Sequence, residues 1–151
     1  MDRYVSEPME HPRAHGEDAP YARADLVFYD VDPKGASYYG LVFLNAPDAD
    51  ETTPAEPSNG FAGWFTVFGH GGCFGDDEDH CAPPPPAPDP YDLTIPVGIP
   101  LQTKTVQVTE ALQAVEGETF QVTVVAIAPG EKGPERADAL QFGRLRLLTY
   151  A

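Results

Sequence analysis

Short stretches in which apolar and polar residues alternate, or apolar residues follow one another, recur along most of this chain. They are rich in Val, Ile, Leu, Phe and Tyr and are bounded by Gly, Pro, Asn and Asp, as is typical of β-strands. The stretches that predict strands are 26–31, 37–45, 61–68, 91–97, 104–108, 119–127 and 140–148. The pattern therefore predicts an all-β fold, an antiparallel, jelly-roll-like β-sandwich of about seven or eight strands.

Two local signals add detail to this pattern. The segment 109–115 has apolar residues at helical spacing, and Thr109 stands where an N-cap is expected, so we predict one short helix there. The sequence Asp-Pro-Lys-Gly at 32–35 is a turn signal, because Pro presets φ and Gly accepts a positive φ. We therefore expect 37–45 to be the hairpin partner of 26–31.

The first 23 residues differ from the rest of the chain. Residues 1–23 contain prolines, histidines and mixed charges without an apolar period, so we expect a flexible N-terminal arm. Residues 24–151 are expected to form a single β-sandwich domain, which is long enough to bury a core. The 17 prolines and 14 glycines of the chain favour turns over helices.

The charge balance restricts the partners of the chain. With 24 acidic and 9 basic residues the net charge is −15, which disfavours nucleic acid and anionic membrane surfaces. No apolar run approaches the roughly 18 residues of a membrane span, and the first residues lack a signal-peptide pattern. We therefore expect a cytoplasmic protein, or a segment of a larger one, with no nucleic-acid or membrane partner. A reducing compartment favours free thiols or a metal site over a disulfide.

Both cysteines and two of the four histidines fall within the segment 70–81. His70, Cys73, His80 and Cys81 supply two imidazoles and two thiols, a donor set that suits Zn(II) or Cu(I). Because adjacent residues of an extended strand point to opposite sides, the last two can share an ion only if the backbone turns there. The paired Cys-x-x-Cys spacing of zinc fingers is absent. The cluster predicts a metal site without identifying the metal.

Other states of the two cysteines remain open. A disulfide between Cys73 and Cys81 would close a short loop and stabilise the fold by about 2–3 kcal/mol. The two can also be plain surface thiols. The acidic run 76–79 disfavours bare thiolates, so a bound cation would be needed to hold the sulfurs deprotonated. His11 and His15, in the expected arm, are possible auxiliary metal ligands.

Two aromatic residues side by side predict a surface feature. Trp64 and Phe65 are consecutive in a predicted strand and therefore face opposite sides of the sheet. One of them is expected in the core, and the other is a candidate for an interface patch. The sequence has no Ser/His/Asp triad motif, phosphate loop or dinucleotide fingerprint that would indicate an enzyme.

Five segments carry a resemblance to a known family, and they are 25–31, 39–45, 60–65, 108–112 and 120–125. The third, Gly-Phe-Ala-Gly-Trp-Phe, is followed by a histidine-bearing segment. In this order the segments resemble the C-terminal domain of plant-type polyphenol oxidases, in the type 3 copper group that also contains tyrosinases and haemocyanins. The third segment is similar to a Phe-Ala-Gly motif of that family. The similarity extends over roughly residues 24–149.

The resemblance implies a lid rather than an enzyme. In that family the domain is a β-sandwich without catalysis of its own, which covers the dicopper centre of a separate helical domain and places a bulky side chain over its entrance. In some fungal relatives the lid also carries a pair of cysteines thought to help load copper. This chain has four histidines and so cannot supply the six that bind the dicopper centre. We therefore expect a non-catalytic shielding or copper-delivery module, with a type 3 copper oxidase catalytic domain as its partner.

The resemblance also suggests roles for residues of the cluster. Its two histidines and two cysteines are then expected to hold Cu(I) transiently and to pass it on by ligand exchange. Phe74 is the first candidate for the gate side chain and Phe68 the second, although packing inside the sandwich is the preferred expectation for Phe68. Without an oxidase partner, the alternatives are an autonomous Zn- or Cu-binding protein for storage, sensing or structure, and a disulfide-stapled structural domain.

Overall fold

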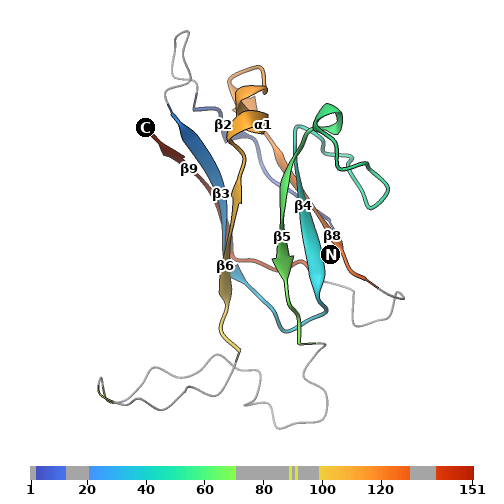
Figure 1. Ribbon diagram of the computed structural model, residues 1–151, viewed down its shortest axis with the longest axis vertical. Coiled ribbons are helices and arrows are strands. Elements are labelled where there is room, and N and C mark those ends of the chain that lie inside the picture. Colours follow the sequence, from blue (N-terminus) through green and yellow to red (C-terminus); the bar gives the residue numbers. More distant parts are fainter. Residues whose placement is uncertain (1–2, 13–20, 71–88, 90, 92–98, 130–138) are drawn as a thin grey trace.

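Two β-sheets that face each other form the body of the protein (Figure 1). The computed structural model describes residues 3–12, 21–70, 89, 91, 99–129 and 139–151. The strand pairs in these residues are antiparallel. The strands are β1 (Arg3–Val5), β2 (Met9–Glu10), β3 (Arg23–Val31), β4 (Tyr38–Leu44), β5 (Phe61–Val67), β6 (Gln102–Gln107), β7 (Thr119–Phe120), β8 (Val122–Ile127) and β9 (Arg144–Tyr150). The predicted fold class, an all-β antiparallel sandwich, is confirmed.

The two main sheets differ in size. The four-stranded sheet has the order β1-β8-β4-β5, and the three-stranded sheet has the order β6-β3-β9. β2 and β7 form a separate short pair. At one side of the sandwich the edge strands β5 and β6 come into contact, but no ladder joins them, so the two sheets remain distinct layers. The expected strand over 91–97 lies almost wholly outside the described residues.

The predicted hairpin of 26–31 with 37–45 is wrong. β3 pairs with β6 and β9, whereas β4 pairs with β5 and β8. The chain therefore passes from one sheet to the other through 32–37 (Figure 1). Burial explains the difference, because Leu26 and Phe28 of β3 have no exposed surface. A strand this buried needs a neighbour on each side and a facing sheet, which a hairpin alone does not provide.

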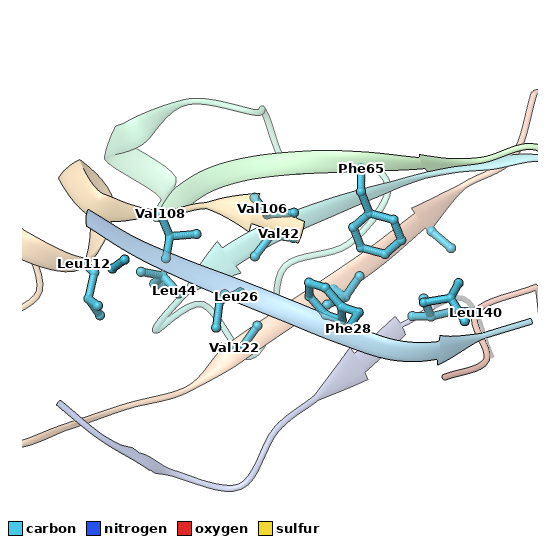
Figure 2. Packing of buried hydrophobic residues seen from close by; sticks show 14 of the residues in the cluster. Leu26, Phe28, Val42, Leu44, Phe65, Val106, Val108, Leu112, Val122 and Leu140 are labelled. Atoms are coloured by element: carbon cyan, nitrogen blue, oxygen red, sulfur yellow. The ribbon is translucent and has the colours of Figure 1, made fainter. Parts of the chain in front are cut away.

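The inward side chains of the two sheets form one apolar core (Figure 2). Phe28 of β3 meets Phe65 of β5 across the sandwich with ring centroids 4.9 Å apart. The Phe65 ring also covers Gly40, its cross-strand partner in β4, where a Cβ atom would lie 2.5 Å from the ring. Glycine at this position therefore leaves the space that the aromatic ring fills.

Residues 3–12 belong to the sandwich, although the sequence pattern placed them in a flexible arm. β1 pairs with β8, and β2 pairs with β7. Between these strands Ser6 is buried, and its hydroxyl accepts a hydrogen bond from the Val122 N–H at 2.9 Å. Tyr4 packs edge-on against Phe142 with centroids 4.8 Å apart. These partners are more than 100 residues away in the chain. The local pattern of apolar residues therefore did not predict the two strands.

The short helix α1 (Thr109–Gln113) lies at one end of the sandwich (Figure 1). Its N-cap is Val108 and not the predicted Thr109. The Thr109 hydroxyl instead accepts a hydrogen bond from the Ala24 N–H at 3.0 Å, and Leu112 is fully buried. Contacts with the sheet thus determine where the helix begins. Within the described ranges no helix has the length and apolarity to cross a membrane.

Candidate functional site

The outward face of the four-stranded sheet carries apolar side chains where a sheet face in water usually carries polar ones. Tyr39 lies opposite Thr66 in the β4–β5 ladder. The next outward pair is Leu41 and Trp64. We call this surface the aromatic face, and its members are Val5, Tyr39, Leu41, Phe43, Phe61, Trp64, Thr66, Phe68, Thr123, Val125 and Ile127.

Two aromatic side chains on the β4–β5 side of the aromatic face are half exposed. Trp64 is 56% exposed and Tyr39 48%. Their rings meet edge-on, with centroids 6.0 Å apart. Phe65, which follows Trp64, is 5% exposed and packs in the core. The alternation predicted from the sequence therefore holds, with Phe65 in the core and Trp64 on the surface.

One end of the aromatic face is covered by the chain itself. Phe43 and Val125 are buried there in a second hydrophobic cluster with Ala49. Phe61 also packs there, since its ring meets the Phe43 ring edge-on with centroids 5.6 Å apart. The loop 46–56 thus shields this end, while the end that carries Tyr39, Trp64 and Phe68 is open.

The loop that covers the aromatic face is acidic. Between β4 and the 3₁₀ turn η1 (Pro57–Asn59) it carries Asp48, Asp50, Glu51 and Glu56, all of them exposed. Hydrogen bonds from the hydroxyl and N–H of Thr52 lower the pKa of Asp50 and so favour its ionised form. The apolar surface therefore has a rim of fixed negative charge on one side.

Phe68 directly follows β5 and is 81% exposed. The preferred expectation, that it packs inside the sandwich, is wrong. Phe65 and Val67 face inward at 5% and 2% exposure, so the alternation of the strand turns position 68 outward. Phe68 therefore extends the aromatic face beyond the end of β5.

The backbone after Phe68 is held in place. The Gly69 N–H donates a hydrogen bond to the Ser37 hydroxyl at 2.9 Å. A Cβ atom on Gly69 would lie 2.2 Å from the carbonyl oxygen of Gly35, so only glycine lets the two backbones approach this closely. Phe68 is thus an exposed ring whose neighbouring backbone is held in place.

His70 is the one predicted metal ligand that the structure describes. Its side chain is exposed, and its backbone N–H donates to the Pro33 carbonyl at 3.0 Å. It therefore lies at the same end of the sandwich as Phe68. The other cluster residues and the second arm histidine lie outside the described residues, together with the possible disulfide, and they are Cys73, Phe74, His80, Cys81 and His15.

His11 lies at the opposite end of the sandwich, beside α1 (Figure 1). It is 6% exposed, and its Nε2 lies 2.9 Å from the Leu112 carbonyl oxygen. To bond a carbonyl oxygen this nitrogen must carry the hydrogen, so it is not the atom to bind a metal. The structure therefore separates His11 from His70. Within the described ranges no three His, Cys, Asp or Glu side chains gather as a metal site.

Sequence reasoning missed Tyr39 as a surface residue. The signal was present, because Tyr38 and Tyr39 are consecutive in a predicted strand and only one of them can face the core. Tyr38 is 2% exposed, whereas Tyr39 is 48% exposed. What the described residues offer is therefore a surface suited to binding, with Phe68 at its edge.

Comparison with known proteins gives the fold a counterpart. No family model matches the chain, and no curated protein sequence is significantly similar to it. Among solved structures, latent aurone synthase (polyphenol oxidase) from natural source is similar over 99% of this chain, with a TM-score of 0.55 and 17% identity. The recombinantly expressed latent enzyme is similar over 99% of this chain, with a TM-score of 0.55 and 16% identity.

These similarities concern the fold. The chain spans about a quarter of the length of the polyphenol oxidase chains that it matches, since 24% of each is covered. The match extends over nearly all of this chain, which agrees with the resemblance found in the sequence. What is shown is that this chain folds like one part of a polyphenol oxidase.

Proposed function

We propose that this sandwich is a non-catalytic domain that covers the dicopper site of a type 3 copper oxidase catalytic domain. The observation that carries the proposal is the match of nearly the whole chain to a quarter of latent polyphenol oxidases. Those proteins are named as latent, so this fold accompanies an oxidase that is held inactive. The four histidines of this chain are too few for a dicopper centre of the family type, which supports a covering rather than a catalytic role.

Phe68 is the described residue best suited to block an entrance. It projects from the end of β5 with 81% of its surface exposed, and the hydrogen bonds of Gly69 and His70 hold the backbone beside it. Because this backbone is already held, it loses little conformational entropy when the ring enters a cleft, and the contact stabilises the covered state. Phe74, the first candidate from the sequence, remains the alternative.

The covering role is tested by inhibition. Purified chain is added to a polyphenol oxidase catalytic domain that lacks its own sandwich, and the rate of catechol oxidation is measured. We expect the rate to fall with increasing chain concentration and to recover on dilution. The Phe68→Ala variant should bind but inhibit at least about tenfold less, because the ring that fills the entrance is gone.

Leu101→Ala is the matched control, since Leu101 directly precedes β6 of the other sheet and is an apolar residue at 45% exposure. Its inhibition should equal that of the unmodified chain. An oxidation rate that stays constant at every chain concentration contradicts the covering role. If Phe68→Ala inhibits fully and Phe74→Ala does not, the blocking residue is Phe74 and the role itself stands.

The proposal includes copper delivery by the cluster 70–81. Two imidazoles and two thiolates suit Cu(I), and this ion would be cargo that passes to the oxidase by ligand exchange, without change of oxidation state. His70, the described member, supports delivery because it is exposed and stands two residues from Phe68. This ligand thus lies close in the chain to the side chain proposed to face the dicopper site.

Cu(I) titration against a chromogenic chelator tests the delivery role. We expect one tightly bound Cu(I) per chain, loss of that site in Cys73→Ser/Cys81→Ser, and faster activation of copper-free oxidase by the loaded chain than by the same amount of free Cu(I). An activation rate unchanged by the double substitution contradicts delivery. A preference for Zn(II) with a raised melting temperature indicates an autonomous metal protein, and the absence of titratable thiols indicates a disulfide.

A further inference from the structure

We propose that the open end of the aromatic face, around Tyr39, Trp64 and Phe68, is the surface through which the sandwich docks on the oxidase catalytic domain. This inference rests on the proposed function and adds to it the contact surface and the chemistry of its partner. The partner surface would be apolar at its centre and basic on one side.

The first argument is composition. Trp64 and Tyr39 leave about half of their surface in water, and Phe68 leaves more. In the four described strands of this sheet, Arg3 is the charged residue at an outward ladder position, and it lies in the edge strand β1 away from β5. Aromatic side chains without charged neighbours are what buried centres of protein interfaces contain.

The second argument is rigidity. Trp64 pairs with Leu41 in the β4–β5 ladder, and its ring meets the Tyr39 ring edge-on with centroids 6.0 Å apart. Phe68 stands on the fixed backbone of Gly69. A ring pair and a backbone that are already in place lose less entropy on binding, so such a surface gains affinity from the area that it buries.

The third argument identifies the occupant. A second copy of this chain would bring its own acidic loop 46–56 against the first, because a two-fold interface uses the same patch on both copies. With a net charge of −15 on each copy, repulsion opposes that arrangement. A partner with basic groups beside its apolar centre avoids the repulsion and pairs with Asp48 and Glu56. The matched polyphenol oxidases, in which three quarters of the chain lies outside this fold, supply the class of partner.

The single tryptophan provides a direct test. The chain is labelled with 5-fluorotryptophan, so that Trp64 gives one fluorine resonance, and the oxidase catalytic domain is added unlabelled. We expect this resonance to shift on addition. Calorimetric titration should show Trp64→Ala and Tyr39→Ala binding at least about tenfold more weakly, and Tyr150→Ala, exposed to a similar 46%, binding as the unmodified chain does. Circular dichroism confirms that each variant is folded.

The outcomes separate the inference from the proposed function. If the chain binds and inhibits the oxidase but Trp64→Ala and Tyr39→Ala do so equally well, the docking surface is overturned and the covering role stands. If the chain binds no oxidase catalytic domain, the covering role fails and the inference fails with it. A fluorine shift that follows the concentration of the chain alone, with a dimer in sedimentation, assigns the surface to a second copy and overturns the inference.

Discussion

The two outward faces of the sandwich use their side chains differently. On the three-stranded sheet Arg23 and Arg144 have partners within the chain. The Arg23 Nε lies 2.9 and 3.0 Å from the two carboxylate oxygens of Asp25, which is 2% exposed. The Arg144 guanidinium lies 4.4 Å above the centre of the Tyr29 ring. We call this surface, with Arg146 and Tyr150, the arginine face.

On the aromatic face the large side chains have no comparable partners among the residues that the structure describes. Tyr39 and Trp64 touch each other and remain about half exposed, and Phe68 extends into solvent. On the arginine face Arg23 and Arg144 each have a partner within the chain, although Tyr150 there is 46% exposed. The exposed Trp64 and Phe68 of the aromatic face support the proposal that this face contacts a second molecule.

The largest expected effect compares two neighbours in β5. Phe65→Ala removes a buried ring from the core and should lower the free energy of unfolding by about 3–5 kcal/mol. Trp64→Ala removes a larger but half-exposed side chain and should cost less than about 1 kcal/mol. Urea denaturation of both variants measures the difference. Equal losses would mean that the aromatic face serves the fold, and the contrast between the two faces would then disappear.

A smaller loss of stability is expected from substitution of Gly69, which follows Phe68. Gly69→Ala forces a methyl group against the backbone of Gly35 and should lower the free energy of unfolding by about 1–3 kcal/mol. Because the shift moves Phe68, the variant should also inhibit the oxidase less than the unmodified chain at equal occupancy. Gly35→Ala is the comparison, because the nearest heavy atom to a Cβ atom there would be the Ala139 Cα at 3.9 Å, an ordinary van der Waals contact. Full inhibition by Gly69→Ala would show that inhibition does not require the close approach of the backbones at Gly69 and Gly35.

The strands could be predicted from the sequence because their signal is local. The alternation over 61–68 predicted β5 almost to the residue, and it also implied that one of Trp64 and Phe65 lies at the surface. Strand pairing was not predictable in the same way. The hairpin of 26–31 with 37–45 was a reasonable expectation from a turn signal, but the burial of β3 in the middle of a sheet depends on strands far away in the chain.

The candidate site was predictable only in part, for a related reason. That Phe68 faces outward follows from the buried positions of Phe65 and Val67, which the sequence pattern does not separate from the opposite register. The position of His11 depends on Leu112, about one hundred residues later in the chain. The ligand set that includes Cys73 and Cys81 stays a prediction.

Substitutions on the arginine face test whether the pairing of its polar side chains stabilises the fold. Arg23→Ala leaves the buried Asp25 carboxylate without its bidentate partner, so the urea midpoint should fall. The control Arg146→Ala removes an exposed arginine of the same face and should leave the midpoint nearly unchanged. Equal midpoints for the two variants would show that the pairing on the arginine face does not stabilise the fold.

The smallest effect at neutral pH is expected for Tyr38, the inward neighbour of Tyr39. Burial, with a lesser contribution from the Asp32 carboxylate, raises the pKa of Tyr38 well above its ordinary value of 10.0. Above about pH 10 the unfolded chain releases this proton while the folded chain keeps it. The unfolded state then binds fewer protons, so the free energy of unfolding must fall as the pH rises.

Tyr38→Phe should therefore weaken the loss of stability above about pH 10, and Tyr39→Phe should leave the profile unchanged. At pH 7 the Tyr38 hydroxyl is buried without a hydrogen-bond partner among the described residues, so its removal should leave stability equal or slightly higher. Urea denaturation from pH 7 to 11 measures both effects. Parallel profiles for all three proteins would contradict the assignment of Tyr38 to the dry interior. The same result would also contradict the difference in role between the two consecutive tyrosines, Tyr38 in the core and Tyr39 on the proposed docking surface.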